Sequence, residues 1–268
     1  MLDNQGEVSQ SPSVTPVVNA QAEKQLERDP KARKVWQKLA FRRALSATTL
    51  VLALLLFLWW LPYTSRRLLV TSIVANRQLI LLLLGFGLIM MSLLWSAGQR
   101  LDVWMFKAIN SRGARPKWMD FAMWGITQLG TVGFIAPVII LFYVGGRPRF
   151  AIDLTLGTLT LLLLVTIIKA IADRARPFNL LLETKVIGWK AAGLSFPSGH
   201  TTQSFFIATV TINYFRLPLA AAVVLYAIAI TVGVTRVYLG AHYPRDVMAG
   251  AILGLIWGTM GVIIAPYI

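Results

Sequence analysis

Long runs of apolar residues recur along this chain, and they restrict its fold more than any other feature. The stretch 218–235 contains no charged residue, and the stretch 246–266 contains only Asp246. A helix that crosses a bilayer needs about 20 predominantly apolar residues. Charged residues make up 14% of the chain, whereas soluble globular proteins contain about 25%. The chain is therefore expected to be all-α, folded as a multi-pass membrane helical bundle.

Seven apolar segments are predicted to form the membrane helices. They lie near residues 44–62, 78–97, 119–144, 150–172, 200–215, 218–235 and 246–266. Aromatic residues at their ends, such as Trp59 and Trp118, are typical of the membrane interface. Residues 99–112, between the second and third segments, carry apolar side chains at helical spacing. They are expected to form a short helix in the plane of the interface.

The apolar segments divide the chain into three parts. Residues 1–43 form a polar, basic tail, in which residues 4–22 have the composition of a disordered segment. Residues 21–43 contain eight Lys or Arg and favour a helix beside anionic headgroups. Residues 44–77 are expected to form an additional N-terminal transmembrane helix and a loop. The main domain follows over residues 78–268.

Composition excludes several kinds of chemistry. The chain has no cysteine, which excludes disulfides, thiolate catalysis and Cys-ligated metals. Its two histidines are His200 and His242, and its formal net charge is +15. The basic residues fall between apolar helices. Membrane lipid headgroups and a phosphorylated lipid are therefore the expected partners, and nucleic acid is not.

Two polar connections are expected to emerge on the same side of the membrane. One covers residues 173–199 and follows the fourth apolar segment, and the other covers residues 236–245 and follows the sixth. Because both follow an even number of crossings, both histidines and most of the loop arginines are brought to one face.

The first polar cluster closes the fourth apolar segment. Lys169 and Arg176 are seven residues apart, which is two helical turns, so both side chains can point the same way. Pro177 favours an end of the helix before it, which leaves Arg176 at the mouth of the bundle. Basic residues also commonly flank spanning helices, so this cluster alone does not require a functional role.

The second cluster, Phe196-Pro197-Ser198-Gly199-His200, opens the fifth apolar segment. Proline suits the first turn of a helix. The N–H groups of Ser198, Gly199 and His200 are expected to point outward at the positive end of the helix, where phosphate binds. Ser198 adds a hydroxyl donor, and Gly199 permits close approach of the backbone to a ligand. The alternative is a simple capped helix start with an incidental histidine.

The third cluster runs from Thr235 and Arg236 to His242. Arg236 offers a planar fork for two phosphate oxygens. Pro244 marks a helix start, and Asp246 falls in its first turn, where a carboxylate is favoured. From there Asp246 can reach back to His242 and fix its tautomer, as in catalytic triads. The alternatives are a helix cap and an interfacial histidine. Because all three clusters meet at one face, they predict a phosphate site.

The ordered motifs Lys-x6-Arg-Pro, Pro-Ser-Gly-His and (Ser/Thr)-Arg-x5-His-x3-Asp resemble those of the type 2 phosphatidic acid phosphatase family. These lipid phosphate phosphatases share their site with vanadium haloperoxidases and bacterial acid phosphatases. The resemblance covers roughly residues 78–266 and implies a six-helix core, to which this chain adds an N-terminal helix. The third motif usually begins with Ser, and Thr235 keeps the hydroxyl here.

The resemblance implies a role for each predicted site residue. His242 attacks phosphorus and forms a phosphohistidine, Asp246 orients it, and His200 protonates the leaving lipid oxygen and then activates water. The equatorial oxygens are stabilised by Lys169, Arg176, Arg236, Ser198 and the Gly199 N–H. No metal or other cofactor is expected. Three cationic side chains take that place, and the sequence lacks a carboxylate cluster suited to Mg²⁺.

A site at the membrane face suits a lipid whose phosphate lies at the headgroup plane. The candidates are undecaprenyl diphosphate, phosphatidylglycerol phosphate and phosphatidic acid, and similarity to compact bacterial members favours a polyprenyl diphosphate. A phosphotransferase that uses the same histidine is the main alternative. A lipid or ion transporter is a weaker one, and a haloperoxidase is disfavoured because those enzymes are soluble.

The first apolar segment decides the side of the membrane on which the site lies. The family resemblance implies six spanning helices, cytoplasmic termini and a site on the outer face. The basic tail favours a cytoplasmic N-terminus, and seven crossings would then place the site in the cytoplasm. We expect a protein of the bacterial plasma membrane with an outward-facing site.

Overall fold

The computed structural model describes residues 74–264, apart from residues 111, 112, 114, 182 and 191, and five isolated positions before them (52, 56, 59, 67 and 71). The predictions for the tail lie outside the described residues. So do those for the apolar segment 44–62, apart from three isolated positions.

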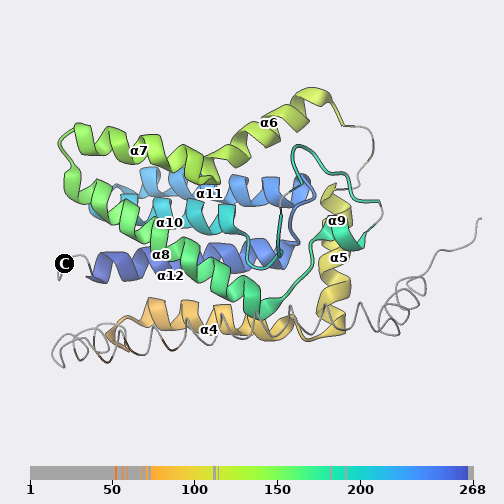
Figure 1. Cartoon of the computed structure of the whole chain (residues 1–268), viewed down its shortest axis with the longest axis horizontal. Helices are drawn as coiled ribbons and strands as arrows, with labels where there is room; N and C mark the ends of the chain where they lie inside the picture. The colour runs from red at the N-terminus through yellow and green to blue at the C-terminus, as the bar shows by residue number, and fades with distance from the viewer. Residues whose placement is uncertain are drawn as a thin grey trace, which may run out of the picture. The chain divides into compact units, whose positions relative to one another are not determined.

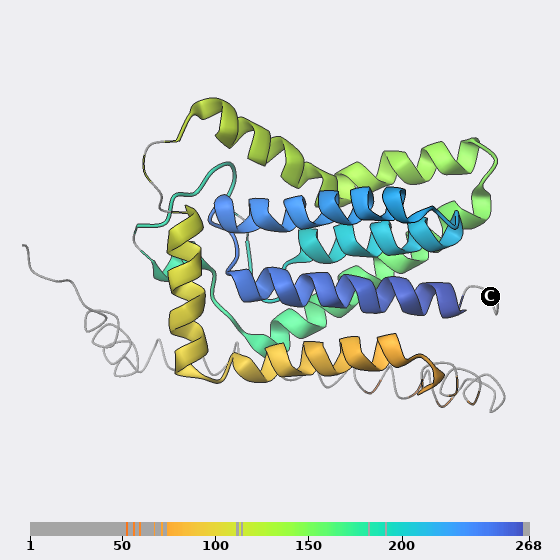
Figure 2. The same cartoon turned by 180° about the vertical axis from the view of Figure 1, so that it is seen from behind.

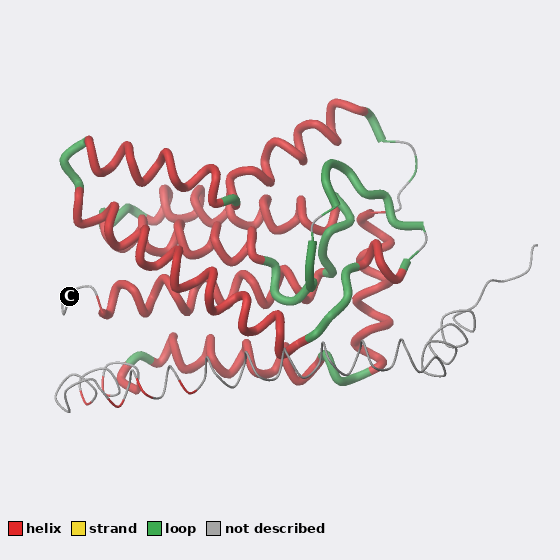
Figure 3. The backbone as a smooth tube through the Cα atoms, viewed as in Figure 1, coloured by secondary structure: helices red, strands yellow, loops and turns green. Residues whose placement is uncertain are grey.

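The described chain is helical, and no strand occurs in this part of it (Figures 1 and 3). Its elements are α4 (Arg77–Ser92), α5 (Ser96–Asn110), α6 (Lys117–Thr127), the 3₁₀ helix η1 (Gln128–Gly130), α7 (Val132–Val144), α8 (Pro148–Ala172), α9 (Pro177–Leu180), α10 (Gly199–Tyr214), α11 (Leu219–Tyr238) and α12 (Pro244–Ile264).

Helix α10 lies between α11 and α12, and α4 packs on α12 (Figures 1 and 2). The face of α12 that meets α10 carries Gly250, Gly254 and Gly258. A Cβ atom at Gly250 would lie 2.7 Å from the carbonyl oxygen of Ser198, and one at Gly258 would lie 2.6 Å from Cβ of Thr209. Small residues at this spacing let two helix backbones approach closely. The start of α10 is thereby held against the start of α12.

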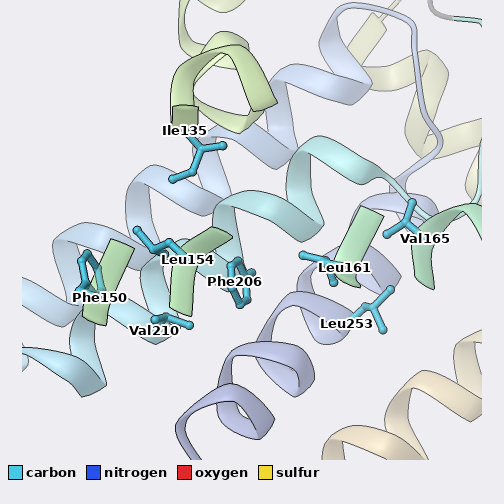
Figure 4. Close-up of a cluster of buried hydrophobic side chains, with 8 residues drawn as sticks. All are labelled: Ile135, Phe150, Leu154, Leu161, Val165, Phe206, Val210 and Leu253. Carbon is cyan, nitrogen blue, oxygen red and sulfur yellow. The ribbon is translucent and has the colours of Figure 1, made fainter. Parts of the chain in front are cut away.

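An apolar core joins α7, α8, α10 and α12 (Figure 4). Phe206 of α10 and Phe150 of α8 are fully buried in it, and Ile135 of α7 and Leu253 of α12 close it from two sides. These side chains alternate at helical spacing with exposed ones such as Leu159, so α8 has one face toward the core and one toward lipid.

By length and composition, three stretches of the described chain can cross a membrane: Pro148–Leu180, Leu219–Tyr238 and Pro244–Ile264. The number rises to five if the bent pairs α4–α5 and α6–α7 each count as one span. The segment predicted as one helix over 119–144 is in fact broken, with a bend of 54°. The 3₁₀ turn ends α6, and extended backbone at Thr131 restarts the chain, where its Oγ1 accepts the N–H of Phe134 at 3.1 Å.

The short helix predicted at 99–112 is α5, which turns 95° from α4 and crosses one end of the bundle (Figures 1 and 2). Its apolar side chains Leu101 and Trp104 are exposed, whereas the polar Asp102 and Asn110 are fully buried. Only Phe106 adds a fully buried apolar side chain to the inner face. The inner face of α5 therefore carries the polar Asp102 and Asn110 beside Phe106, and the exposed side carries Leu101 and Trp104.

Candidate active site

The two polar connections predicted to share one side of the membrane lie at the same end of the bundle (Figures 1 and 2). Helices α8 and α11 end there, α10 and α12 begin there, and α5 crosses there. Each of the three sequence clusters is carried by one of these helix ends. The geometry between them follows from a small number of hydrogen bonds.

His242 is buried between α11 and α12, with 2% of its surface exposed. Nη1 of Arg176 lies 3.1 Å from its Nε2. A guanidinium only donates hydrogen bonds, so Nε2 accepts, and we assign the imidazole proton to Nδ1. Burial lowers the pKa of His242 to about 3, with the positive charges of Arg176 and Arg236 adding to the effect. The imidazole is therefore neutral near pH 7, with its lone pair on Nε2.

The other nitrogen, Nδ1, faces Ser195 and Asp246. Oδ2 of Asp246 lies 3.6 Å from Nδ1, which is too long for a hydrogen bond. The hydroxyl of Ser195 lies between them, 3.4 Å from Nδ1, and it donates to Oδ2 at 2.5 Å. The approach of Asp246 to the imidazole that was expected from the sequence is present at 3.6 Å, and the Ser195 hydroxyl adds a bridge between the two groups. The carboxylate of Asp246 reaches the imidazole through the hydroxyl of Ser195.

Arg176 is fixed by backbone carbonyls. Its Nε donates to Gly193 at 3.0 Å, its Nη2 to Ala192 at 3.1 Å, and its Nη1 to Ala241 at 3.1 Å. The side chain is buried, so these bonds leave the guanidinium little freedom. Each of its three nitrogens has a partner. Nη1, which also faces His242, is held by the carbonyl of Ala241.

Arg236 differs from Arg176 because part of its guanidinium lacks a partner. Its Nη1 donates to Oγ1 of Thr127, on α6, at 2.8 Å. Its Nε is buried without a hydrogen-bond partner in the described structure. Leaving a buried donor unsatisfied costs about 1–3 kcal/mol. An anion placed beside this guanidinium would supply the missing acceptor.

His200 and Lys169 are half-buried, and each is acted on by the charges of Arg176 and Arg236. The charges of Arg236, Lys169 and Arg176, together with His242, all act on His200. The charges of Arg176, Arg236 and Asp246 act in turn on Lys169. The structure therefore brings the predicted histidines and cations together. Their mutual repulsion would fall if an anion lay between them.

The start of α10 differs from the prediction in one respect. The N–H of Ser198 was expected to point outward toward phosphate, but it donates to the backbone carbonyl of Asp246 at 2.9 Å. The Ser198 hydroxyl accepts a hydrogen bond from Thr201 at 3.0 Å and is fully buried. Gly199 lies in more open space, because a Cβ atom added there would meet only Cγ1 of Val165, at 3.9 Å. The Ser198 N–H therefore binds the backbone of α12 and is not available to phosphate.

Three residues of this centre were not singled out from the sequence: Arg174, Ser195 and Thr127. Ser195 precedes the Pro-Ser-Gly-His motif and Arg174 precedes the Arg-Pro pair, so closeness to those motifs was the available signal. Thr127 gives no such signal, because it lies in a different apolar segment. In the described part of the chain, no group of three or more His, Asp or Glu side chains is placed to hold a metal ion.

Comparison with known proteins adds independent findings. A family model described as the PAP2 superfamily matches residues 150–268. Phosphatidylglycerophosphatase B of Bacillus subtilis (strain 168) is 34% identical over 158 residues, which cover 53% of this chain and 73% of that protein. Undecaprenyl-diphosphatase of Sulfolobus acidocaldarius is 28% identical over 155 residues, which cover 57% of this chain and 73% of that protein.

One solved structure agrees with this chain in fold as well as in sequence. The crystal structure of a transmembrane PAP2-type phosphatidylglycerolphosphate phosphatase from Bacillus subtilis superposes with a TM-score of 0.61 at 28% identity. The match covers 69% of this chain and 94% of that one.

Proposed function

The chain belongs to the PAP2 superfamily, and from this premise we propose that it hydrolyses a phosphomonoester or diphosphate of a membrane lipid through a phosphohistidine, without a metal ion. The observation that carries the proposal is the contact between Arg176 and Nε2 of a buried, neutral His242. It combines a nucleophilic lone pair with a cation able to receive phosphate oxygens. The protein is a multi-pass membrane enzyme of the phosphoric ester hydrolase class.

In the first step, Nε2 of His242 attacks phosphorus. The N–P bond forms as the bond from phosphorus to the lipid oxygen breaks. His200, which the negative phosphate of the bound substrate keeps protonated, gives its proton to that oxygen. The imidazole becomes positively charged. Its Nδ1–H faces the hydroxyl of Ser195, and behind it the carboxylate of Asp246. This bridge holds the ring and stabilises the charge that develops on it.

In the second step, His200 is neutral and takes a proton from water. The water oxygen attacks phosphorus, the N–P bond breaks, and inorganic phosphate leaves. The electron pair of that bond returns to Nε2, so the nucleophile is restored as neutral imidazole. His200 ends protonated, as it began.

The equatorial oxygens carry the negative charge that both steps must stabilise. We assign Lys169, Arg176 and Arg236 to these oxygens, because the charge of each acts on His200 and the buried Nε of Arg236 is a donor that lacks an acceptor in the described structure. We also assign the Gly199 N–H and the Ser198 hydroxyl to this set, and the buried position of Ser198 makes it the weakest member. Prearranged cations of this kind supply most of the catalysis in phosphoryl transfer.

A phosphorylated lipid is the substrate that suits a site at the end of a membrane bundle. Undecaprenyl diphosphate, phosphatidylglycerol phosphate and phosphatidic acid remain the candidates, and two of them correspond to substrates in the names of relatives. The test is phosphate release by the purified protein from each lipid, with chelator present. His242→Ala is expected to abolish release, and chelator is expected to leave it unchanged.

A radiolabelled phosphate group tests the intermediate itself. Wild-type protein mixed briefly with labelled substrate is expected to carry label that is stable to alkali and lost in acid, as phosphohistidine is. His242→Ala is expected to carry none. Label retained by His242→Ala would contradict the mechanism. Addition of lipid alcohols as acceptors separates hydrolysis from transfer, because a transferase would move the label to the lipid.

We place the active site on the outer side of a bacterial plasma membrane. The chain has no cysteine, so single cysteines report accessibility cleanly. Lys190→Cys marks the exposed connection beside the site, and Ser9→Cys marks the tail. In intact cells, an impermeant maleimide is expected to label the first. Labelling of Lys190→Cys only after the cells are opened would reverse the orientation. Ser9→Cys on the same side as Lys190→Cys would indicate an even number of crossings between the two positions, and on the opposite side an odd number.

A further inference from the structure

A connected group of four buried charges links α5 to the proposed catalytic pair. Arg174 donates through Nη1 to Oδ1 of Asp246 at 2.6 Å, and through Nη2 to Oδ2 of Asp102 on α5. Asp102 also accepts the backbone N–H of Arg245 at 3.0 Å and its Nε at 3.1 Å. Both carboxylates have no exposed surface. Two negative and two positive charges therefore balance each other inside the protein.

Arg174 links the two carboxylates of this group. It is the only side chain of the four that contacts both carboxylates. One of these carboxylates, Asp246, faces His242 through Ser195. The other, Asp102, binds Arg174 and Arg245 and lies on α5, away from the imidazole. Whatever holds Arg174 in place therefore decides how much of the negative charge of Asp246 remains available to the imidazole.

We propose that Asp102 is a positioning residue for the reaction and acts through Arg174 on the Asp246–Ser195–His242 bridge. The inference rests on the proposed function. When Asp102 shares the guanidinium, Arg174 neutralises Asp246 only in part. Without the Asp102 carboxylate, Arg174 pairs with Asp246 alone, and the group gains one net positive charge. The imidazolium that forms when His242 attacks is then less well stabilised.

The helix that carries Asp102 provides a matched control. Asn110 lies on the same inner face of α5 and is also fully buried. Its side chain binds the carbonyl oxygens of Lys185 and Tyr238 and the N–H of Lys185, each at 2.9 Å. These partners are backbone groups outside the group of four charges. Asn110→Ala thus weakens the attachment of α5 without altering the charge on Asp246.

The experiment compares steady-state kinetics and thermal unfolding of the purified full chain. For Asp102→Asn, kcat is expected to fall about 10- to 100-fold, while KM changes less than about threefold, because Asp102 acts on the developing charge and not on the bound phosphate. Asn110→Ala is expected to lower Tm about as much as Asp102→Asn does, and to change kcat less than about twofold. Equal kcat losses in the two variants would reduce Asp102 to an anchor of α5 and overturn the inference.

A double-mutant cycle tests whether the effect passes through Arg174. Arg174→Gln leaves the buried Asp246 carboxylate without its cation, which favours the protonated, neutral form, so this variant on its own is expected to lower kcat. Adding Asp102→Asn to it is expected to lower kcat little further, because the two residues act as one unit. Additive losses would overturn the inference. If Asp102→Asn does not fold, Asp102→Asn/Arg245→Gln keeps the buried charges balanced, and its kcat is expected to fall because Arg174 still pairs with the Asp246 carboxylate alone.

The outcomes separate this inference from the function on which it rests. A wild-type protein that releases no phosphate from any of the three lipids overturns both. If the wild type is active and Asp102→Asn keeps its kcat, the inference alone is overturned, and the proposed phosphatase activity is unaffected.

Discussion

Arg176 donates to Nε2 of His242 at 3.1 Å while three backbone carbonyls hold the rest of its guanidinium. Backbone groups of the protein therefore fix the position of the guanidinium. In this state it occupies the lone pair that the proposed reaction uses. Substrate phosphate has to draw Nη1 away from Nε2, and its oxygens are better acceptors for a guanidinium than a ring nitrogen.

Arg176→Lys is expected to lower kcat/KM by at least about 100-fold, although it keeps the positive charge. An ammonium cannot replace three nitrogens that bind different carbonyls, so the loop at Ala192 and Gly193 loses its attachment as well. Steady-state phosphate release measures the effect. Arg147→Lys, at the exposed start of α8 on the far end of the bundle, is the control and is expected to behave as wild type. Comparable activity of Arg176→Lys and wild type would contradict the assigned role.

Ser195→Ala removes the hydroxyl between Asp246 and His242. We expect kcat to fall about 10- to 100-fold, because the carboxylate at 3.6 Å is then too distant to hold Nδ1 directly. KM is expected to change little. Thr209→Val is the control, since Thr209 is also buried and its hydroxyl binds the carbonyl of Phe205 within α10. If Ser195→Ala retains full kcat, Asp246 orients the histidine without a bridge.

The low pKa of His242 makes stability depend on pH in a defined direction. Burial lowers this pKa from 6.5 to about 3. Between these values the unfolded chain binds a proton that the folded chain does not, so protonation favours unfolding. The contribution of His242 to stability is complete above pH 6.5 and is lost as the pH falls toward 3. Tm measured from about pH 7 to about pH 4 is expected to decrease, and His242→Gln is expected to decrease less steeply. Equal slopes would argue against a buried neutral imidazole.

Gly250→Ala tests the contact between α10 and α12. The added Cβ would lie 2.7 Å from the carbonyl oxygen of Ser198. Overpacking of this kind costs about 1–3 kcal/mol, and here it also displaces the start of α10, so both Tm and kcat are expected to fall. Gly87→Ala on α4 is the matched control. A Cβ there meets nothing within 4 Å, so the better helix propensity of alanine is expected to preserve or raise Tm.

The long apolar segments were predictable because local sequence determines them. The prediction 150–172 corresponds to α8 at Pro148–Ala172, and the prediction 246–266 corresponds to α12 at Pro244–Ile264. In both cases a proline marks the start, and an apolar run supplies the length. The break at Gln128–Gly130 escaped prediction, because the residues on both sides of it are equally apolar and the interruption depends on how Gly130 packs against the backbone of His200.

The centre itself was predictable in its composition and less so in its contacts. Lys169, His200 and His242 share one end of the bundle because α10 and α11 lie between the two connections and return the chain to the same end. Partners far apart in sequence could not be deduced. Arg174 and Asp102 are 72 residues apart, and nothing in the spacing of α5 indicates that its acid faces inward. Amphipathicity identified the helix, but it gave no indication of which face meets the protein.

The hydrogen bond from the Ser198 N–H to the Asp246 carbonyl joins two motifs by main chain alone. At position 198, proline is the one amino acid that lacks the donor itself. Side chains around the centre can therefore be altered for other head groups while this main-chain link between the two motifs is kept. Laboratory evolution of this scaffold toward new lipids is expected to leave that link untouched.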